Sequence, residues 1–196
     1  MHPSLLILLI GLLYLLSFGA LSFARRQGLS TRFAVESLTV TAVGAALAFA
    51  SVPLHPVLFL LIVYLVTMRV RLLVDLGNWL ASKERYEQAL SLFQFALRLG
   101  PDGVSRQIVL INRGVTQLHM QEPEAAYLTL KEVLADEDIR PGARYLAAGH
   151  YNLGLACRRT GREAEAIRHF NEAIDSSPGS VYAHGARRAL KQAADE

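Results

Sequence analysis

A spaced pattern of small residues most limits what this chain can fold into. Residues 152–180 read NLGLACRRTGREAEAIRHFNEAIDSSPGS, a charged, helix-favouring stretch. Counted from its first glycine, the residues of interest lie at relative positions 0, 7, 12, 16, 19 and 24: Gly154, Gly161, Ala166, Phe170, Ala173 and Pro178. A stretch that is helical and yet small at fixed points indicates that another helix must come close there.

The same spacing occurs twice more upstream. Counted from Gly77, the residues at the same relative positions are Glu84, Ala89, Phe93, Ala96 and Pro101. Starting from Gly114, the spacing meets a more divergent set, whose proline comes three residues late: Gln121, Ala126, Leu130, Val133 and Pro141. The chain therefore carries three copies of a unit of about 34 residues, which is typical of stacked helical repeats.

Each unit is interpreted as two antiparallel helices joined by a short turn. The glycine and the alanine twelve residues later would let the helix axes approach to about 8–10 Å. Phe93, Leu130 and Phe170 would fill the wedge between units, and Pro101 and Pro178 would end the second helix. One unit cannot bury its own apolar face, so the fold depends on stacking.

This pattern, L-G…A…F..A….P, resembles the tetratricopeptide repeat (TPR). The resemblance covers residues 70–180 as three units, about 70–103, 107–140 and 147–180, with residues 181–196 as a capping helix. The usual aromatic positions hold other residues: Leu73, Leu110, His150, Leu80, Gln117 and Cys157. The fold class expected is all-α, with N-terminal transmembrane helices followed by a right-handed α-solenoid of three TPR helix pairs plus the cap.

The first third of the chain, residues 1–69, reads as a membrane domain. Leu5 to Ala24 contains no charged residue, and about 20 such residues span a hydrocarbon core as a helix, here about residues 4–24. The alternative is a cleaved signal peptide, which would need a basic start and a shorter apolar run. The start, Met1 to Ser4, has no Lys or Arg, so we favour the membrane helix.

A second apolar region follows and is interrupted by Pro53 and Pro56. Because proline breaks helices, we expect a helical hairpin with arms at about 34–52 and 56–70. The second arm could continue into the first repeat as one helix, or the hairpin could be re-entrant and never fully cross. Glu36, near the membrane edge, is interpreted as a solvated residue at a helix start.

Positive charges predict the orientation of the membrane part. Arg25, Arg26 and Arg32 follow the first helix, and Arg69 and Arg71 follow the hairpin. Positive residues beside short loops stay cytoplasmic. The predictions are therefore a multi-pass protein of a bacterial inner or thylakoid-type membrane, an external N-terminus and a cytoplasmic repeat region. A single tilted crossing of residues 34–68 would invert this topology.

Charge and motif patterns argue against several functions. Residues 70–196 hold 16 basic and 16 acidic residues, so no net positive field favours nucleic acid. No phosphate-binding loop, nucleophile elbow or zinc-protease motif is present, so neither catalytic residues nor a cofactor is expected. His119, His150 and His169 look scattered over different repeats, and no metal site is predicted. Cys157 is interpreted as an inert core thiol, and Asp136–Asp138 as a solvated loop.

The resemblance implies a partner groove lined by the first helix of each unit. Placed by family position, the groove residues are Asn78, Ser82, Ile108, Ile111, Asn112, Val115, His119, Tyr151, Asn152, Leu155, Arg158 and Arg159. Asn78 and Asn112 match asparagine positions of the family's carboxylate clamp, but its basic positions are missing. The middle of the groove is apolar, which suits an amphipathic helix or an extended apolar segment. Arg158 and Arg159 could meet an acidic flank or be ordinary solvated residues.

These observations predict a membrane-anchored TPR adaptor that binds a protein segment, with membrane lipid around its anchor. The layout is similar to membrane-tethered TPR proteins that help assemble photosystem I, from which it differs by its longer, three-segment membrane part. Two alternatives stay open at this point. One is a structural subunit held in a membrane complex through its apolar helices, and the other is a lipid- or pigment-binding protein that uses His55 or the hairpin.

Overall fold

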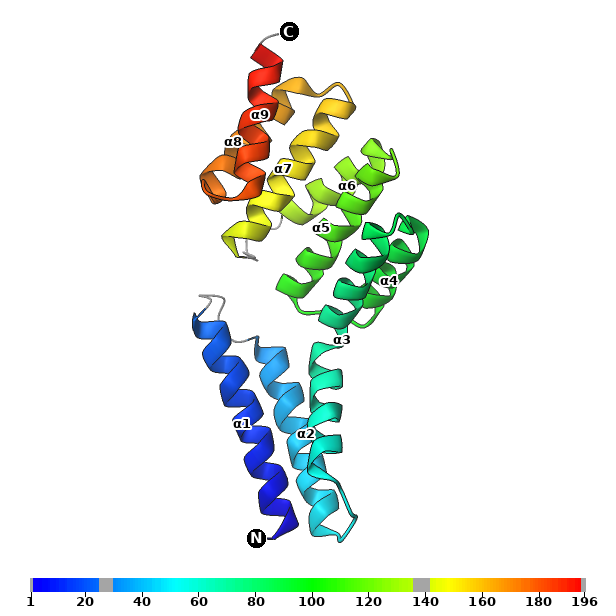
Figure 1. Cartoon of the computed structure of the whole chain (residues 1–196), viewed down its shortest axis with the longest axis vertical. Coiled ribbons are helices and arrows are strands. Elements are labelled where there is room, and N and C mark those ends of the chain that lie inside the picture. The colour runs from blue at the N-terminus through cyan, green and yellow to red at the C-terminus, as the bar shows by residue number, and fades with distance from the viewer. Residues whose placement is uncertain (1, 25–29, 136–141, 195–196) are drawn as a thin grey trace. The chain divides into compact units, whose positions relative to one another are not determined.

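The computed structural model describes residues 2–24, 30–135 and 142–194, and these are helical with short connections (Figure 1). Nine helices occur in these ranges: α1 (Pro3–Ala24), α2 (Thr31–Phe49), α3 (Pro56–Ser82), α4 (Tyr86–Arg98), α5 (Gly103–His119), α6 (Pro123–Leu134), α7 (Ala143–Arg159), α8 (Glu163–Ser176) and α9 (Val181–Ala194). The all-α fold class is therefore confirmed. Arg25, Arg26 and Asp136–Asp138 lie outside the described residues.

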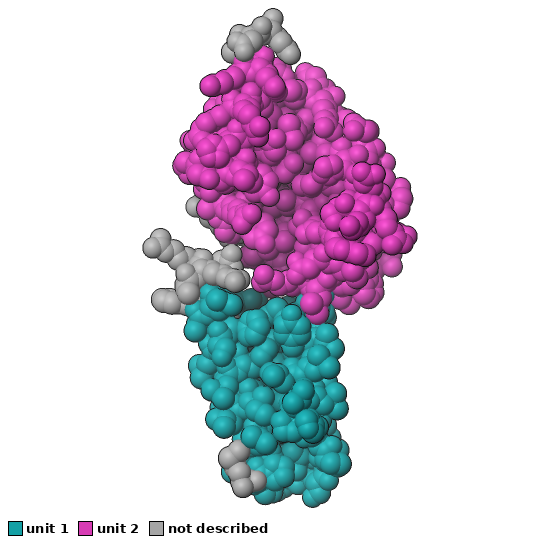
Figure 2. Space-filling view, viewed as in Figure 1, with its two compact units in different colours: residues 1–70 teal, residues 71–196 magenta. Residues whose placement is uncertain are grey.

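The chain divides into two compact units, residues 1–70 and 71–196 (Figure 2). The helix α3 begins at Pro56 in the first unit and continues without interruption to Ser82 in the second. The two prolines predicted to break the apolar region lie in the connection before α3 and at its first residue. Proline is tolerated at a helix start because the N–H it lacks would have no helical partner there.

The first unit consists of three helices that are long and apolar enough to cross a membrane: α1, α2 and α3. Their contacts use small residues, which let the helices approach one another closely. A Cβ added to Gly11 would lie 2.2 Å from Thr41 Oγ1, and one added to Gly44 would lie 2.8 Å from the Phe59 ring. Most of the large apolar side chains on these helices point outward, among them Leu5, Leu12, Leu16, Val43, Leu58 and Leu65.

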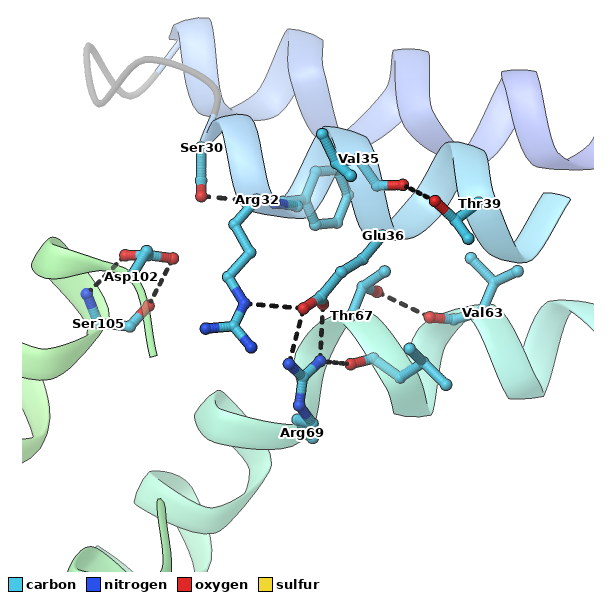
Figure 3. A network of polar contacts seen from close by, with 12 residues as sticks. Ser30, Arg32, Val35, Glu36, Thr39, Val63, Thr67, Arg69, Asp102 and Ser105 are labelled. Atoms are coloured by element: carbon cyan, nitrogen blue, oxygen red, sulfur yellow. Dashed lines mark hydrogen bonds and ion pairs between the residues drawn. The ribbon is translucent and has the colours of Figure 1, made fainter. Parts of the chain in front are cut away.

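Several polar side chains inside the first unit are paired with one another, although Ser37 Oγ is buried without a hydrogen-bond partner among the described residues. The Tyr14 hydroxyl lies 2.6 Å from Thr67 Oγ1 and so connects α1 with α3. The Arg69 guanidinium donates to both carboxylate oxygens of Glu36, at 2.6 and 2.7 Å, and Arg32 Nε adds a third bond at 2.8 Å (Figure 3). The interpretation of Glu36 as a merely solvated residue was wrong, because its carboxylate connects α2 with α3.

The second unit is built from helix pairs that share one turn geometry. The pairs are the end of α3 with α4, α5 with α6, and α7 with α8 (Figure 1). The residue seven positions after each pair's glycine adopts a left-handed backbone: φ is 61° at Glu84, 63° at Gln121 and 75° at Gly161. In each turn the next N–H donates to a carbonyl five residues back, from Arg85, Glu122 and Arg162 to Leu80, Gln117 and Cys157. These helix ends are three copies of one glycine-type C-cap. This explains why the third helix pair has a glycine, Gly161, at relative position 7.

Candidate protein-binding face of the helix pairs

The glycine of each unit marks the closest approach within its helix pair. A Cβ added to Gly77 would lie 2.4 Å from the Phe93 ring, one added to Gly114 would lie 2.6 Å from Leu130, and one added to Gly154 would lie 2.7 Å from the Phe170 ring. The bulky residue sixteen positions later therefore packs over the glycine of its own helix pair. This differs from the interpretation in which that residue fills the wedge between units.

The residues at the other helical positions of the pattern are also buried. The residues at relative positions 12 and 19 expose at most 2% of their surface: Ala89, Ala96, Ala126, Val133, Ala166 and Ala173. Pro101 follows the end of α4, and Pro178 follows the end of α8. A shared buried core joins α5, α6, α7, α8 and α9 through apolar residues such as Leu110, Leu153 and Ala186.

Two rows of equivalent positions on the first helices stay accessible. The residues directly after the glycines are Asn78, which is exposed, and Val115 and Leu155, which are half-buried. The residues five positions after the glycines, Ser82, His119 and Arg159, are all exposed. Helical residues four apart share a face, so the two rows form one strip, called here the first-helix face. The His119 ring is stacked on that of Tyr86 with 6.0 Å between ring centroids.

Several of the predicted groove residues have little solvent-exposed surface. Ile111 exposes 3% and Asn152 8% of their surface, so their assignment to a partner groove is corrected here. Ile111 belongs to the buried core, and the Asn152 amide donates to Ala148 O at 2.8 Å within its own helix. Asn112 is half-buried, and its amide likewise donates to Ile108 O at 2.7 Å. The superhelical stacking of neighbouring pairs covers these positions, which the sequence spacing does not reveal.

Tyr151 is also packed against other helices, so it is not freely accessible to a partner. A Cβ added to Gly185 would lie 2.9 Å from the Tyr151 ring, so α9 packs directly on it. The Tyr182 and Phe170 rings each lie 6.1 Å from it, centroid to centroid. Ile108 is half-buried on α5.

The two arginines at the end of α7 have structural partners. Arg158 Nη2 donates to Ala189 O in α9 at 2.9 Å, and its guanidinium lies 4.9 Å from the centroid of the Phe170 ring. Arg159 Nη1 donates to Leu118 O in the last turn of α5 at 2.8 Å. Leu118 lies at the C-terminal end of α5, where the helix dipole makes a cation favourable. These side chains connect neighbouring helices, a role that neither sequence interpretation of the pair anticipated.

Comparison with known proteins agrees with this geometry. The family model described as the tetratricopeptide repeat matches residues 147–180, which are the pair α7 and α8 with the proline that follows. Residues 147–180 therefore form a tetratricopeptide repeat. No curated protein matches it significantly. The spacing of Gly77 and Gly114, and the turn shared by all three pairs, extend the TPR architecture to the two preceding pairs.

A cluster of polar side chains inside the third TPR was missed by sequence reasoning. His150 on α7 and His169 on α8 stack with their ring centroids 5.5 Å apart, and their Nδ1 atoms are 3.3 Å apart. Glu172 Oε2 lies 3.0 Å from the first Nδ1 and 2.7 Å from the second. Burial lowers the pKa of His150 against the opposing effect of the Glu172 charge. The two histidines are therefore not scattered, since the antiparallel pair brings together residues 19 positions apart.

Cys157 lies in the same helix pair and is fully buried. Burial, followed by the nearby Glu165 charge, raises the pKa of its thiol to about 11. A thiol is far less reactive than a thiolate, so this geometry favours a packing role.

Proposed function

We propose that this protein is a membrane-anchored TPR adaptor, which binds a segment of a protein partner on its first-helix face. The partner class that we propose is a membrane protein complex under assembly. The observation that carries the proposal is α3: its N-terminal part is a candidate membrane span, and its last turns hold Gly77, the packing glycine of the first TPR. A single helix is thus shared by the apolar bundle and the repeats.

The surface of the first unit supports a lipid environment. Its three helices expose large apolar side chains around the bundle, while its charged pair, Glu36 with Arg69, is satisfied internally. In water such a surface would be an aggregation liability, because monomeric soluble proteins rarely expose apolar patches of more than a few hundred Å². In lipid the same surface is matched to its surroundings, and the internal pairing avoids an unpaired charge.

The chemistry of the first-helix face suggests which segment it would bind. Val115 and Leu155 give a shallow apolar row, and Ser82, His119 and Arg159 provide polar groups beside it. An amphipathic helix or extended segment with apolar side chains on one side suits this arrangement. Repeat stacks use such surfaces for protein recognition, since each further repeat lengthens the same strip.

The orientation that we propose places the repeats in the cytoplasm. Three crossings put the N-terminus on the opposite side of the membrane from the repeats. Arg69 and Arg71 then lie at the cytoplasmic end of the membrane-crossing part of α3, as positive residues near short loops do. Protease added to sealed inside-out vesicles should digest the TPR region, whereas sealed right-side-out vesicles should protect it. Digestion from the outer face alone would reverse the assignment.

The binding proposal is tested by charge substitutions on two faces of the repeats. The full chain is isolated from detergent-solubilised membranes, and co-purified proteins are quantified. Val115→Arg with Leu155→Arg places charges on the first-helix face, and we expect this variant to reduce recovery of the partner strongly. The matched control, Leu128→Arg with Ile167→Arg, places the same charges on exposed residues of α6 and α8 and should leave recovery unchanged.

Recovery that is equal in both variants would refute the first-helix face as the binding surface. If the partner were also retained by a chain without residues 71–196, the apolar helices would be the interface, as a structural subunit requires. Circular dichroism of each variant verifies that the helices are intact, so that a loss of partner is not a loss of fold.

A further inference from the structure

The two histidines and the glutamate of the third TPR converge on one point from two helices. His169 and Glu172 are three residues apart on α8, a spacing that puts side chains on the same helix face. His150 reaches this face from α7, the antiparallel partner helix. Two aromatic nitrogens and one carboxylate oxygen thereby face each other, at the distances of 3.3, 3.0 and 2.7 Å given above.

These separations are close to those of a metal site. Ligands placed tetrahedrally about 2.0–2.1 Å from Zn²⁺ are about 3.3–3.4 Å from one another. The two Nδ1 atoms already have this separation. The two histidine–carboxylate distances are shorter, because His169 forms a hydrogen bond with Glu172 and His150 lies at ion-pair distance from it. Glu172, whose side chain is 41% exposed, has room to move outward and lengthen them.

We propose that His150, His169 and Glu172 form a binding site for one divalent transition-metal ion. Two imidazoles and one carboxylate favour Zn²⁺ and its neighbours over Mg²⁺ or Ca²⁺, which prefer oxygen ligands alone. The exposed side of Glu172 leaves a fourth position for water. A bound ion would link α7 to α8 and so stabilise the third TPR, against which α9 packs.

Two neighbouring features have to be weighed against this site. Arg168 Nε lies 4.0 Å from a Glu172 oxygen, and a nearby cation opposes metal binding. Its side chain is 64% exposed, however, and can turn toward solvent. A second group, Cys157 with Glu165 and His169, also has its ligand atoms within 4.8 Å of one another. Its sulfur is completely buried, so this set lacks the access from solvent that the first set has.

The test uses the full chain in detergent micelles, purified without a histidine tag and stripped with a chelator. Zinc content per chain is measured after equilibration with zinc and removal of the free ion. Co²⁺ is then titrated, because tetrahedral coordination gives it a strong visible absorption. We expect one ion per chain, and a loss of affinity of at least about tenfold in His150→Gln and in Glu172→Gln, since the loss of even an outer partner costs that much.

Two control variants and three overturning outcomes make the test decisive. His184→Gln removes an exposed histidine of α9 and should bind like the wild type, as should Cys157→Ala. The proposal is overturned if the folded wild-type protein binds no ion in excess zinc, or if Glu172→Gln and His150→Gln keep its affinity. A loss in Cys157→Ala but not in Glu172→Gln would also overturn it and assign the ion to the second group. Glu172 is on the surface, so its variant is expected to fold.

Discussion

Replacing Gly154 by alanine tests the close approach on which each helix pair depends. The added Cβ would lie 2.7 Å from two atoms of the Phe170 ring, whereas carbon atoms in contact are about 3.5–4.0 Å apart. Phe170 is fully buried, so its ring cannot move into solvent, and overpacking of this kind costs about 1–3 kcal/mol. Alanine recovers about 0.5–1 kcal/mol relative to glycine in a helix, which leaves a net loss of up to about 2.5 kcal/mol with a central value of about 1 kcal/mol.

Gly149→Ala is the matched control on the same helix. There the added Cβ would meet Leu134 Cδ2 at 3.1 Å, and its next neighbours are 3.6 Å away. That methyl group is the far end of a flexible side chain and can yield. The control therefore keeps the gain in helix propensity without the clash, and we expect unchanged or slightly higher stability.

Hydrogen exchange followed by mass spectrometry measures both variants in the full chain. Peptides from α7 and α8 should exchange about 5 times faster in Gly154→Ala, the factor that corresponds to a loss of about 1 kcal/mol. Peptides from α1 and α2 should not change. Equal exchange rates in Gly154→Ala and the wild type would refute the reasoning, and so would equal losses of protection in the two alanine variants.

Three further predictions concern single positions. Cys157, with its pKa raised to about 11, should react with a thiol reagent at pH 8 about 100-fold more slowly than an exposed cysteine, and rapid reaction without denaturant would contradict this. Gly161→Ala should cost about 1 kcal/mol by chemical denaturation because φ is 75° there, whereas Gln121→Gly should stabilise; changes of the same sign would be inconsistent. Glu36→Gln should lower the stability by about 1.5–3 kcal/mol and so lower the thermal midpoint in detergent. Adding Arg69→Met to this variant should restore part of the lost stability. An unchanged midpoint in Glu36→Gln would show that the ion pair is dispensable.

The repeating helix pairs could be predicted from the sequence because their determinants are local. A small residue at a fixed spacing identifies a close approach, and the proline after the second helix identifies its end. The residue opposite each glycine could not be assigned this way. Phe93, Leu130 and Phe170 reach back to the glycine of their own unit, and this depends on the angle between the two helices.

Which residues of the proposed binding face stay accessible was harder to predict, because burial depends on contacts between neighbouring helix pairs. Ile111 and Asn152 fall at groove positions of the family, yet neighbouring helices cover them. Arg159 looks like a solvated helix end in the sequence, but it bonds to a carbonyl 41 residues away. The convergence of His150 with His169 likewise requires the register of two antiparallel helices, although a histidine three residues before a glutamate on one helix was a usable signal.

Site-specific photo-crosslinking in intact membranes tests the adaptor proposal most directly. A photoreactive amino acid is placed at Val115, on the first-helix face, or at Leu128, an exposed residue of α6 in the same TPR. The account predicts a discrete adduct with a membrane-associated protein from position 115 and its absence from position 128. The same adduct from both positions, or an adduct from position 128 alone, would contradict it.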